Sequence, residues 1–594
     1  MRRNSFVIIV VGVLALIAVG RIISTYRVTS VAWDEPCHIA AGIEWLDKGT
    51  YNMDPIHPPL SRDAIGLPLY LAGERLPVFT DGRGDHDYYD YGTRILYDGG
   101  HYFRNLVLAR IGVLPFFLLT IVLVFWWTRR MFGPSEGTLA ALAAVFLYTT
   151  TPSVLAFAGL AYTDTTTACM QFATLFALVT WIQKPTRGST AVLGIALGLA
   201  LLSKMTTLLF LPASAVGILL ARWTVGAKTP EKSEAQPEKP ALEISKSQWL
   251  TRLGLALAIA VVVLWGGYKF SVGHVQEDMG LTPQAMPSFQ HFPGPVRSLA
   301  KRAVVSDWMV PAPMLIKGFT VAWVINKVRM PSYMFGNTTP GGSWYFFFVA
   351  LAVKAPLALL ALWFVGVWAV VRRRDWVPLA PAIAVVMILI VAISIQYKEG
   401  VRHLLVVFPL LAMVAGYGAS VLWKSTGKWK LASRIAVVVL IAWQGVASLS
   451  AGRDFISYYN ELAARDPSKI YFTGCDLDCG QDVYRLAEEA RRRNISYLAI
   501  AVWSSADIYQ MGLPKLEILE PNRPVTGWVA ISIRSLKIAQ LFHKQYATDS
   551  YAWLNQYKPV AMVGKTIFLY YIPEGAAVPS QGTEPRVQPG TKGP

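Results

Sequence analysis

Two adjacent carboxylates, Asp34 and Glu35, follow the first long apolar run, in the stretch VAWDEPCHIAAG. Pro36 suits the first turn of a helix and Gly49 its end, so the spacing predicts a short helix over 36–48. A helix dipole favours ionised carboxylates at this N-terminus. Two interpretations follow: the acids cap the helix, or they provide an ionised base that takes a proton from an acceptor hydroxyl.

A histidine and a group of acids follow in the same stretch of chain. In YNMDPIHPPLSRD, His57 precedes two prolines that stiffen an extended turn. It is either a solvated loop residue or part of a site assembled on one loop together with the paired acids. GDHDYYDYG carries Asp85 and Asp87, whose oxygens are weak candidates for binding a divalent ion. A solvated acidic loop is the alternative there.

Charged residues also lie at the ends of apolar runs. Asp164, in LAYTDTTTACM, either caps a helix or lines a polar cavity. Lys204 stands between two short apolar runs, where it must face protein, water or an anion. YKEGVRHLL gathers Lys398, Arg402 and His403 before a later run. Arginine suits bidentate phosphate contacts, so these cations predict a lipid-phosphate site; interfacial snorkelling is the alternative for Arg402.

The composition indicates that these residues belong to a polytopic α-helical membrane protein. The chain has 594 residues, of which 54% are hydrophobic and only 15% charged, and its mean hydropathy is +0.40. The net charge of +18 is distributed in short basic runs beside apolar segments. That distribution indicates membrane topology and gives no reason to expect a nucleic-acid partner.

The apolar runs predict about eleven transmembrane helices, because each is close to the length that crosses a bilayer. The first is expected to be a retained anchor, since Arg21 interrupts its end and no clean cleavage site follows. The runs lie near residues 6–23, 106–127, 137–153, 165–182, 189–203, 206–221, 251–268, 343–371, 377–395, 403–422 and 433–450.

Basic residues between these runs set the expected orientation. By the positive-inside rule, the side that carries the basic N-terminus and the Lys-rich linker 222–250 is the cytoplasm. Loops 24–105, 269–342 and 396–402 then face outward. The other basic residues on the cytoplasmic side are Arg129, Arg130, Lys184, Arg187, Arg372, Arg373, Arg374, Lys424, Lys428 and Lys430.

The last part of the chain is expected to form a separate domain outside the membrane. The transmembrane domain is expected to span 1–451, a small α/β domain 452–573, and a disordered Pro/Gly-rich tail 574–594. KIYFTG, ISYLAIAVW, GWVAISIRSL and KTIFLYYIP are typical of strands, and QDVYRLAEEARRR is typical of a helix. Cys475 and Cys479 are close enough in sequence to form a disulfide in an oxidising compartment.

Taken together, these motifs resemble those of a known family of membrane enzymes. The DE pair, HPPL, the TD at the start of a span, GLALLSKMTTLLFLPA and the late RH resemble the GT-C glycosyltransferases. The closest resemblance is to glycosyltransferase family 39, the protein O-mannosyltransferase-like group with its bacterial aminoarabinose-transferase relatives. It covers about residues 1–450. TGCDLDCGQDVYRLAEEA resembles a D-S-N-x-D-W-G-Q-D segment of uncharacterised bacterial members, with Cys479 at the Trp position and Cys475 replacing a small residue.

The resemblance implies the GT-C fold and an inverting transfer of sugar from a polyprenyl-phosphate carrier to an acceptor on the outer face. Asp34 is then the expected base, with Glu35 and His57 as supporting groups. Arg402, His403 and Lys204 are expected to hold the lipid phosphate. No cofactor is expected to be required, and a divalent metal is possible but not favoured.

The resemblance also implies a role for Asp164, the kinds of acceptor and the location of the protein. Asp164 is expected to orient the acceptor or the sugar. The acceptor is a protein, a lipid or a glycan, and the expected location is a bacterial inner membrane with the C-terminal domain in the periplasm. The alternative function is a lipid or glycolipid transporter, although no repeated halves are visible. A membrane sensor leaves the DE, HPPL and RH motifs unexplained.

Overall fold

Each of the eleven apolar runs is helical in the structure, which is a computed structural model. The structure describes residues 2–80, 86–226, 245–280, 294–463, 465–471, 474–546 and 550–575. Within the predicted linker 222–250, residues 227–244 lie outside the described residues. Residues 576–594 of the predicted tail also lie outside them.

The chain divides into two compact units, one comprising Met1–Gln481 with Ser504–Asp507, and the other Asp482–Trp503 with Ile508–Pro594. The helices of the first unit are α1 (Arg2–Ile23), α2 (Glu35–Asp47), α3 (Pro59–Leu71), α4 (Tyr88–Tyr97), α5 (Tyr102–Ile111), α6 (Leu114–Thr149), α7 (Pro152–Ala158), α8 (Thr163–Gln183), α9 (Arg187–Leu201), α10 (Thr207–Val225), α11 (Lys246–Gly267), α12 (Gly294–Val305), α13 (Pro313–Val328), α14 (Phe346–Lys354), α15 (Leu357–Arg373), α16 (Trp376–Ala392), α17 (Val407–Trp423) and α18 (Lys430–Ser450). Its strands form two short hairpins, β1 (Val272–His274) with β2 (Met309–Pro311) and β3 (Pro331–Met334) with β4 (Asn337–Pro340).

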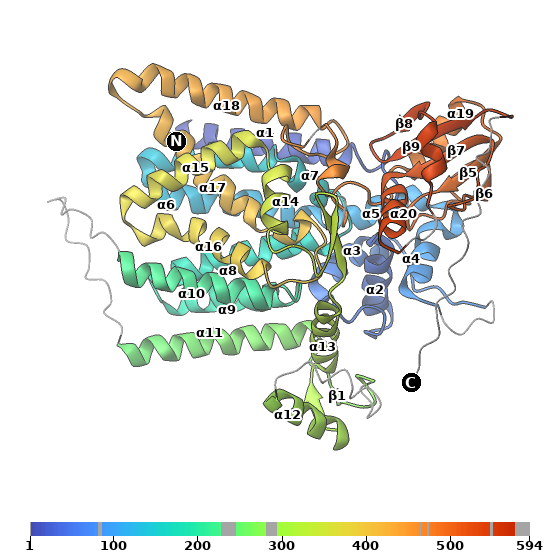
Figure 1. The fold of residues 1–594 in the computed structure, drawn as a ribbon. Helices are drawn as coiled ribbons and strands as arrows, with labels where there is room; N and C mark the ends of the chain where they lie inside the picture. Colours follow the sequence, from blue (N-terminus) through green and yellow to red (C-terminus); the bar gives the residue numbers. More distant parts are fainter. Residues whose placement is uncertain are drawn as a thin grey trace, which may run out of the picture. The chain divides into compact units, whose positions relative to one another are not determined.

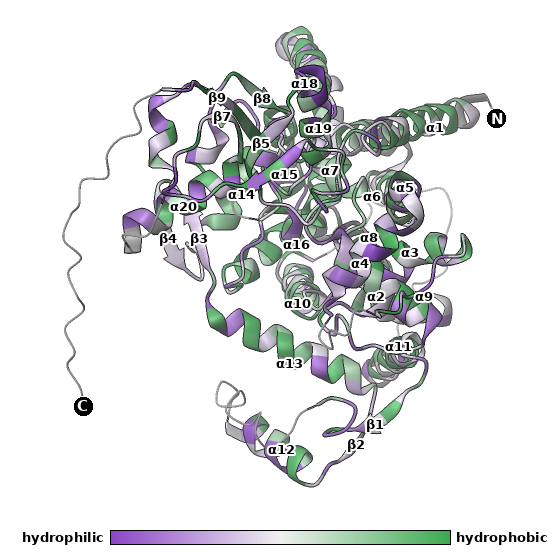
Figure 2. Ribbon diagram, turned by 90° about the vertical axis from the view of Figure 1, so that its right-hand side faces the viewer, coloured by the Kyte–Doolittle hydropathy of each residue, from purple (hydrophilic) through white to green (hydrophobic). Residues whose placement is uncertain are grey.

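The long helices of the first unit run side by side around α17 (Figure 1). α17 packs against α6 and α15, while α9 packs against α8 and α11. Two glycines allow this close packing: a Cβ on Gly416 would lie 2.3 Å from the carbonyl oxygen of Ala140, and one on Gly418 2.3 Å from that of Leu362. α1 is mostly hydrophobic along its length (Figure 2) and largely exposed, as expected of a helix that faces lipid.

Six helices in the described residues are long and apolar enough to cross a membrane, or up to eight if each of two bent pairs counts as one span. In the two bent pairs, the part of α6 over Glu136–Thr149 meets α7 at an angle of 64°, and α14 meets α15 at 111°, next to Pro356. α6 is also broken at Gly133, whose φ is +76°. The shorter apolar helices are α9, α16 and α17. The chain is therefore a largely helical protein with several apolar spans, and the total of eleven stays a prediction.

The first unit extends beyond the predicted boundary at residue 451. Hydrogen bonds of Lys354 and Asn460 explain this difference, because they hold the segment after residue 451 against the end of α14. The Asn460 amide donates to the carbonyl oxygens of Ala352 and Ala355, at 2.6 and 2.7 Å. The first unit therefore extends to Gln481, and the segment KIYFTG, expected to be a strand, is not one in its described residues.

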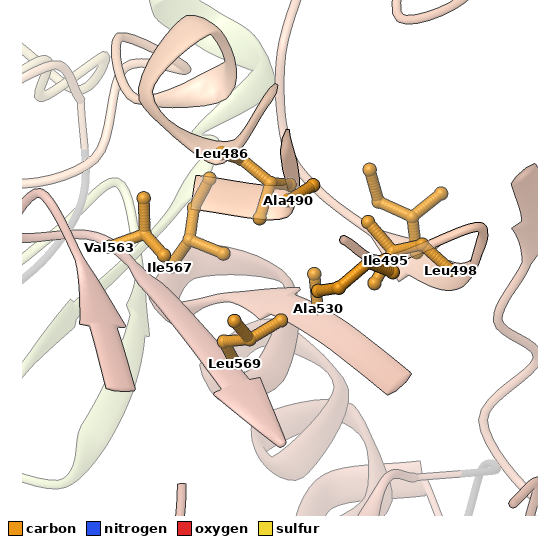
Figure 3. Close-up of a cluster of buried hydrophobic side chains, with 9 residues drawn as sticks. Leu486, Ala490, Ile495, Leu498, Ala530, Val563, Ile567 and Leu569 are labelled. Carbon is orange, nitrogen blue, oxygen red and sulfur yellow. The ribbon is translucent and has the colours of Figure 1, made fainter. Parts of the chain in front are cut away.

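The second unit contains a five-stranded mixed sheet with strand order β6-β5-β7-β9-β8. β5 is parallel to β6 and β7, while β9 is antiparallel to β7 and β8. Figure 3 shows apolar side chains of α19 and of the strands meeting in one core, Leu486 and Leu569 among them. The elements are α19 (Val483–Arg492), β5 (Tyr497–Ala501), β6 (Lys515–Ile518), β7 (Gly527–Ser532), α20 (Ile533–Tyr546), β8 (Ala561–Val563) and β9 (Ile567–Ile572).

Candidate active site

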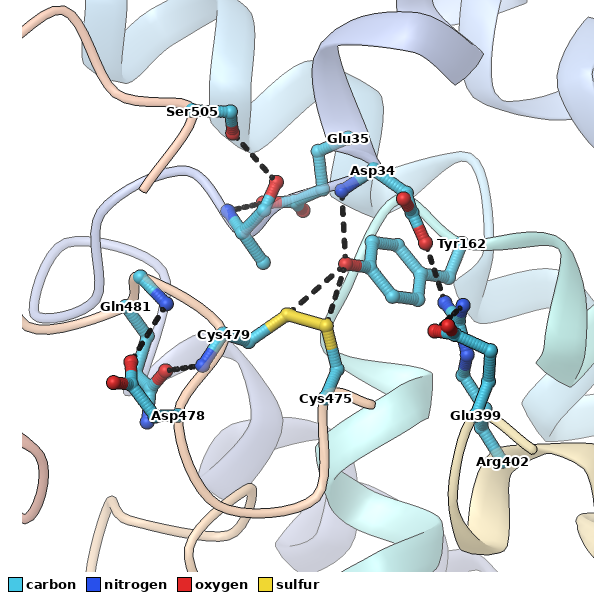
Figure 4. Close-up of a disulfide and its surroundings, with 12 residues drawn as sticks. Asp34, Glu35, Tyr162, Glu399, Arg402, Cys475, Asp478, Cys479, Gln481 and Ser505 are labelled. Atoms are coloured by element: carbon cyan, nitrogen blue, oxygen red, sulfur yellow. Dashed lines mark hydrogen bonds and ion pairs between the residues drawn. A yellow bond between two sulfur atoms is a disulfide. The ribbon is translucent and has the colours of Figure 1, made fainter. Parts of the chain in front are cut away.

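Asp34 lies just before α2, but its side chain forms no capping hydrogen bond with that helix. Its Oδ2 atom instead lies 2.5 Å from Nη1 of Arg402, in the 3₁₀ turn Val401–Leu404. The second guanidinium nitrogen, Nη2, lies 2.6 Å from a carboxylate oxygen of Glu399. The Asp34 and Arg402 side chains face each other (Figure 4) across a sequence separation of 368 residues. The carboxylate of Asp34 is thus one half of a long-range ion pair.

The surroundings of Asp34 keep its carboxylate charged and within reach of solvent. Desolvation raises the pKa of Asp34, but Arg402 together with His38 and His57 outweighs it, so the pKa lies below its usual value. The Asp34 side chain keeps 21% of its surface exposed, whereas Arg402 keeps 9%. An ionised carboxylate that a substrate can reach is the minimum that general-base chemistry requires.

Glu35 is committed to a different set of partners. It is fully buried, and its two carboxylate oxygens each lie 2.8 Å from a nitrogen of the buried Arg110 guanidinium. The same oxygens accept backbone N–H groups from Ala32 and Ala161. Because both oxygens are occupied, Glu35 fixes the start of α2 next to the segment before α8 and leaves Asp34 to face the site.

Tyr162 connects Asp34 to the disulfide between Cys475 and Cys479. The Tyr162 hydroxyl accepts the backbone N–H of Asp34 at 3.0 Å. It also lies 3.1 Å from Sγ of Cys479 and 3.3 Å from Sγ of Cys475 (Figure 4). The disulfide is therefore part of the wall behind the Asp34–Arg402 pair.

The loop 474–481, which contains the disulfide, also holds the turn that carries Arg402. Oδ2 of Asp476 accepts the backbone N–H of Val401 and the hydroxyl of Tyr471, each at 2.6 Å. Gly400 has φ +85°, and a Cβ on it would lie 2.3 Å from the Asp476 carboxylate. The two segments therefore approach closely because a glycine leaves room for the acid.

A buried lysine anchors the segment that leads into this loop. The Lys354 ammonium group, at the end of α14, donates to the carbonyl oxygens of Ile456, Tyr458 and Asp476 at 2.8, 2.7 and 2.5 Å. A buried ammonium is tolerated when its N–H groups are satisfied in this way. Lys354 thus has a role in positioning the loop.

A small polar cavity brings together several of the residues singled out in the sequence. Asp164, in the first turn of α8, accepts a hydrogen bond from the Lys204 ammonium at 2.5 Å. Both residues line the cavity together with Gln171, Arg402 and His403. Within the described residues, Nε of Arg402 and Nδ1 of His403 have no hydrogen-bond partner. The cavity therefore holds two cations, each paired with a carboxylate, next to two side-chain nitrogens that have no partner among the described residues.

His57 pairs with Asp54, a residue that the sequence did not indicate. Nδ1 of His57 lies 2.8 Å from Oδ2 of Asp54, and its ring packs edge-on against that of His38 with centroids 4.8 Å apart. The electrostatic influence of His57 reaches Asp34, where it helps to lower the pKa. His57 thus lies beside the paired residues, oriented by a buried carboxylate.

The remaining predicted site residues lie elsewhere. The Lys398 ammonium donates to the carbonyl oxygen of Ile395 at 2.6 Å and lies 5.1 Å from the centre of the Phe347 ring. Asp87 caps α4 by accepting two of its backbone N–H groups. Asp85 lies outside the described residues.

Several contributors to the site are not indicated by the sequence. They are Tyr162, Arg110, Asp54, Glu399, Asp476 and the disulfide as a wall of the site. The segment TGCDLDCGQD resembles a bacterial motif, but the sequence places it in the expected C-terminal domain and gives no sign that it contacts Asp34. Tyr162 stands two residues before Asp164, so the same helix start that presents the acid also presents the tyrosine.

Comparisons with solved structures find several distant matches. The crystal structure of ArnT from Cupriavidus metallidurans bound to undecaprenyl phosphate is 13% identical, with 94% of this chain and 97% of that chain covered and a TM-score of 0.47. Archaeal oligosaccharyltransferase AglB from Archaeoglobus fulgidus is 14% identical, with coverage of 98% and 75% and a TM-score of 0.43. The S. cerevisiae Pmt1-Pmt2 complex is 16% identical, with coverage of 44% and 32% and a TM-score of 0.31.

A comparison with curated protein sequences finds no match. A family model does match: residues 104–232 fit that of the dolichyl-phosphate-mannose-protein mannosyltransferases. This segment begins in α5, contains Tyr162, Asp164 and Lys204, and ends after α10. The resemblance to the protein O-mannosyltransferase-like glycosyltransferases is therefore confirmed, and its sequence support lies in the helices that carry one side of the polar cavity.

Proposed function

We propose that this protein is an inverting glycosyltransferase that moves a sugar from a polyprenyl-phosphate carrier to an acceptor hydroxyl at the outer face of a bacterial inner membrane. The observation that carries the proposal is the Asp34–Arg402 ion pair beside a cavity lined by Lys204 and His403. An inverting transfer needs one base and one anion site next to each other, which this arrangement provides. The family match over residues 104–232 supports the same reaction class.

In the proposed reaction, Asp34 takes the proton of the acceptor hydroxyl. The acceptor oxygen forms a bond to the anomeric carbon as the bond from that carbon to the phosphate oxygen breaks. The electron pair of the broken bond stays on the phosphate, whose negative charge Arg402, His403 and Lys204 stabilise. Asp164 holds Lys204 in place, so that the ammonium faces the cavity.

Because Asp34 and Arg402 form an ion pair before the donor binds, donor binding also changes the basicity of Asp34. Arg402 already neutralises Asp34, and a carboxylate bound at 2.5 Å to a guanidinium is a weak base. A donor phosphate that takes over the guanidinium removes this partner from Asp34. Donor binding therefore raises the basicity of Asp34, and the base becomes active when the sugar is in place.

The proposal is tested with the purified full-length chain and a panel of undecaprenyl-phosphate-linked hexoses and pentoses labelled in the sugar. Wild-type protein is expected to release or transfer sugar from one of these donors. Arg402→Gln is expected to lose most of that turnover, while Asp98→Asn, which removes half of an exposed ion pair with Arg94, retains it. Movement of intact lipid across vesicle membranes without any sugar release would overturn the proposal in favour of a transporter.

A further inference from the structure

A group of buried metal-ligating side chains lies next to Asp34 and has no part in the reaction proposed above. Cys37 and His38 are consecutive residues in the first turns of α2, and Asp54 belongs to the loop before α3. All three are buried. Sγ of Cys37 lies 3.7 Å from Nδ1 of His38, which lies 3.7 Å from Oδ2 of Asp54. The three ligand atoms all lie within 4.8 Å of one another.

We propose that Cys37, His38 and Asp54 bind a divalent transition-metal ion of the zinc type. Metal–ligand bonds of about 2.0–2.3 Å place neighbouring ligand atoms of a tetrahedral ion roughly 3.3–3.8 Å apart. Two of the three separations already match this spacing, so a small closure of the third pair completes the arrangement. The site is the one group of this kind within the described parts of the chain.

The types of ligand select the class of metal. A sulfur, an imidazole nitrogen and a carboxylate oxygen form a mixed set that suits zinc, whereas magnesium and calcium prefer oxygen ligands alone. On binding, the metal replaces the proton of the Cys37 thiol, which otherwise points to the carbonyl oxygen of Asp34 at 2.9 Å. The thiolate and the Asp54 carboxylate then balance the two positive charges, so the buried site is neutral.

The surrounding contacts fix the two segments that supply the ligands. α2 and α3 pack closely at Gly42 and Gly66, where a Cβ on Gly42 would lie 2.2 Å from the carbonyl oxygen of Arg62. Arg62 in turn donates to the backbone carbonyl of Asp54 at 2.8 Å. His57 donates to the Asp54 carboxylate, the kind of outer contact that orients metal ligands. The two segments that carry the ligands are therefore held close together before any metal binds.

Three protein ligands leave a fourth tetrahedral position for water or for an oxygen of a substrate, as in catalytic zinc sites. The sequence missed this group because two ligands are adjacent in one helix and the third lies in a proline-rich loop, a spacing that matches no common metal motif. The candidates for a metal site that the sequence offers are Asp85 and Asp87.

The test measures metal content and does not depend on glycosyl transfer. Wild-type protein, Cys37→Ser and Cys169→Ser are produced in zinc-supplemented medium, purified, dialysed and analysed by inductively coupled plasma mass spectrometry. Cys169 is the matched control, because it is the other buried free cysteine of the chain. About one zinc per chain is expected for wild type and Cys169→Ser, and at least tenfold less for Cys37→Ser.

Cobalt substitution gives a second readout that reports directly on the sulfur ligand. Wild type and Cys169→Ser loaded with Co²⁺ are expected to show the near-ultraviolet charge-transfer band of a cobalt thiolate, and Cys37→Ser is expected to lack it. Asp54→Asn keeps the shape of the side chain and serves if Cys37→Ser does not fold; it is expected to lower zinc content. Wild-type protein without bound metal overturns the proposal. Equal metal content in wild type and in folded ligand variants also overturns it and indicates an adventitious ion only.

Discussion

At the scale of single residues, the structure assigns the two adjacent acids to different tasks. Successive positions on a helix point about 100° apart, so a DE pair at a helix start cannot face one partner together. Asp34 faces Arg402, which lines the cavity, while Glu35 turns inward to Arg110. The sequence predicted a helix over 36–48, and the structure begins it one residue earlier, at Glu35. The partners of the two acids, arginines 75 and 368 residues away, could not be predicted from the local sequence.

Glu35→Gln is expected to lower stability strongly. The substitution leaves the buried Arg110 guanidinium without its counter-charge, and breaking a fully buried ion pair costs about 3–5 kcal/mol. The measurement is the thermal unfolding midpoint in detergent. Asp98→Asn serves as the control, since exposed pairs contribute at most about 1 kcal/mol. Equal midpoints for the two variants would contradict a structural role for Glu35.

Tyr162→Phe is expected to lower kcat by about five- to tenfold with little change in KM, because one hydrogen bond of about 1 kcal/mol to the Asp34 backbone is lost. The measurement is turnover of a labelled polyprenyl-phosphate sugar. Tyr26→Phe is the matched control, since its buried hydroxyl has no hydrogen-bond partner among the described residues. An unchanged kcat in Tyr162→Phe would show that the hydroxyl does not position Asp34.

At the scale of elements, the site depends on a loop that interlocks with a distant turn. The loop 474–481 contacts the turn at Arg402 through Asp476 and places the disulfide against Tyr162. The sequence marked this loop as a motif, yet it offered no reason to place it beside residues near position 400. Such contacts arise from the packing of whole segments, which local patterns of hydrophobicity do not encode.

Replacing both Cys475 and Cys479 with serine is expected to reduce turnover by at least about tenfold, because a loosened loop lets Arg402 and Asp34 shift relative to the donor. Treatment of wild-type protein with a reductant that opens the bond is expected to have the same effect. Cys169→Ser is the control, as it lies in α8 and forms no disulfide. Full activity in the double variant would rule out a positioning role for the loop.

At the scale of the whole molecule, hydropathy predicted the helices well, because a segment in lipid must form all its backbone hydrogen bonds internally, as a helix does. All eleven apolar runs are helical, and sharp bends separate α6 from α7 and α14 from α15. Hydropathy did not predict the boundary at Gln481, since the segment after α18 is held by buried polar contacts rather than by an apolar run. The candidate site draws on stretches of chain that are far apart in the sequence, from Asp34 to the loop 474–481, and only the folded structure brings them together.

The predicted orientation is tested with reporter fusions in a bacterial host. A fluorescent protein inserted in the linker 222–250 is expected to fluoresce, and one fused after residue 575 is expected to stay dark, because the fluorophore does not form after export across the inner membrane. Alkaline phosphatase is expected to give the opposite pattern. A fluorescent C-terminal fusion would place the second unit in the cytoplasm and refute the predicted topology.

The most direct test of the central claim compares wild type with Asp34→Asn, using both binding of undecaprenyl phosphate and turnover of a labelled donor. The substitution keeps the size of the side chain and removes the base. We expect the variant to bind the lipid phosphate at least as tightly, because Arg402 loses a competing carboxylate, and to turn over at least about 100-fold more slowly. Turnover equal to that of wild type would contradict the assignment of Asp34 as the base.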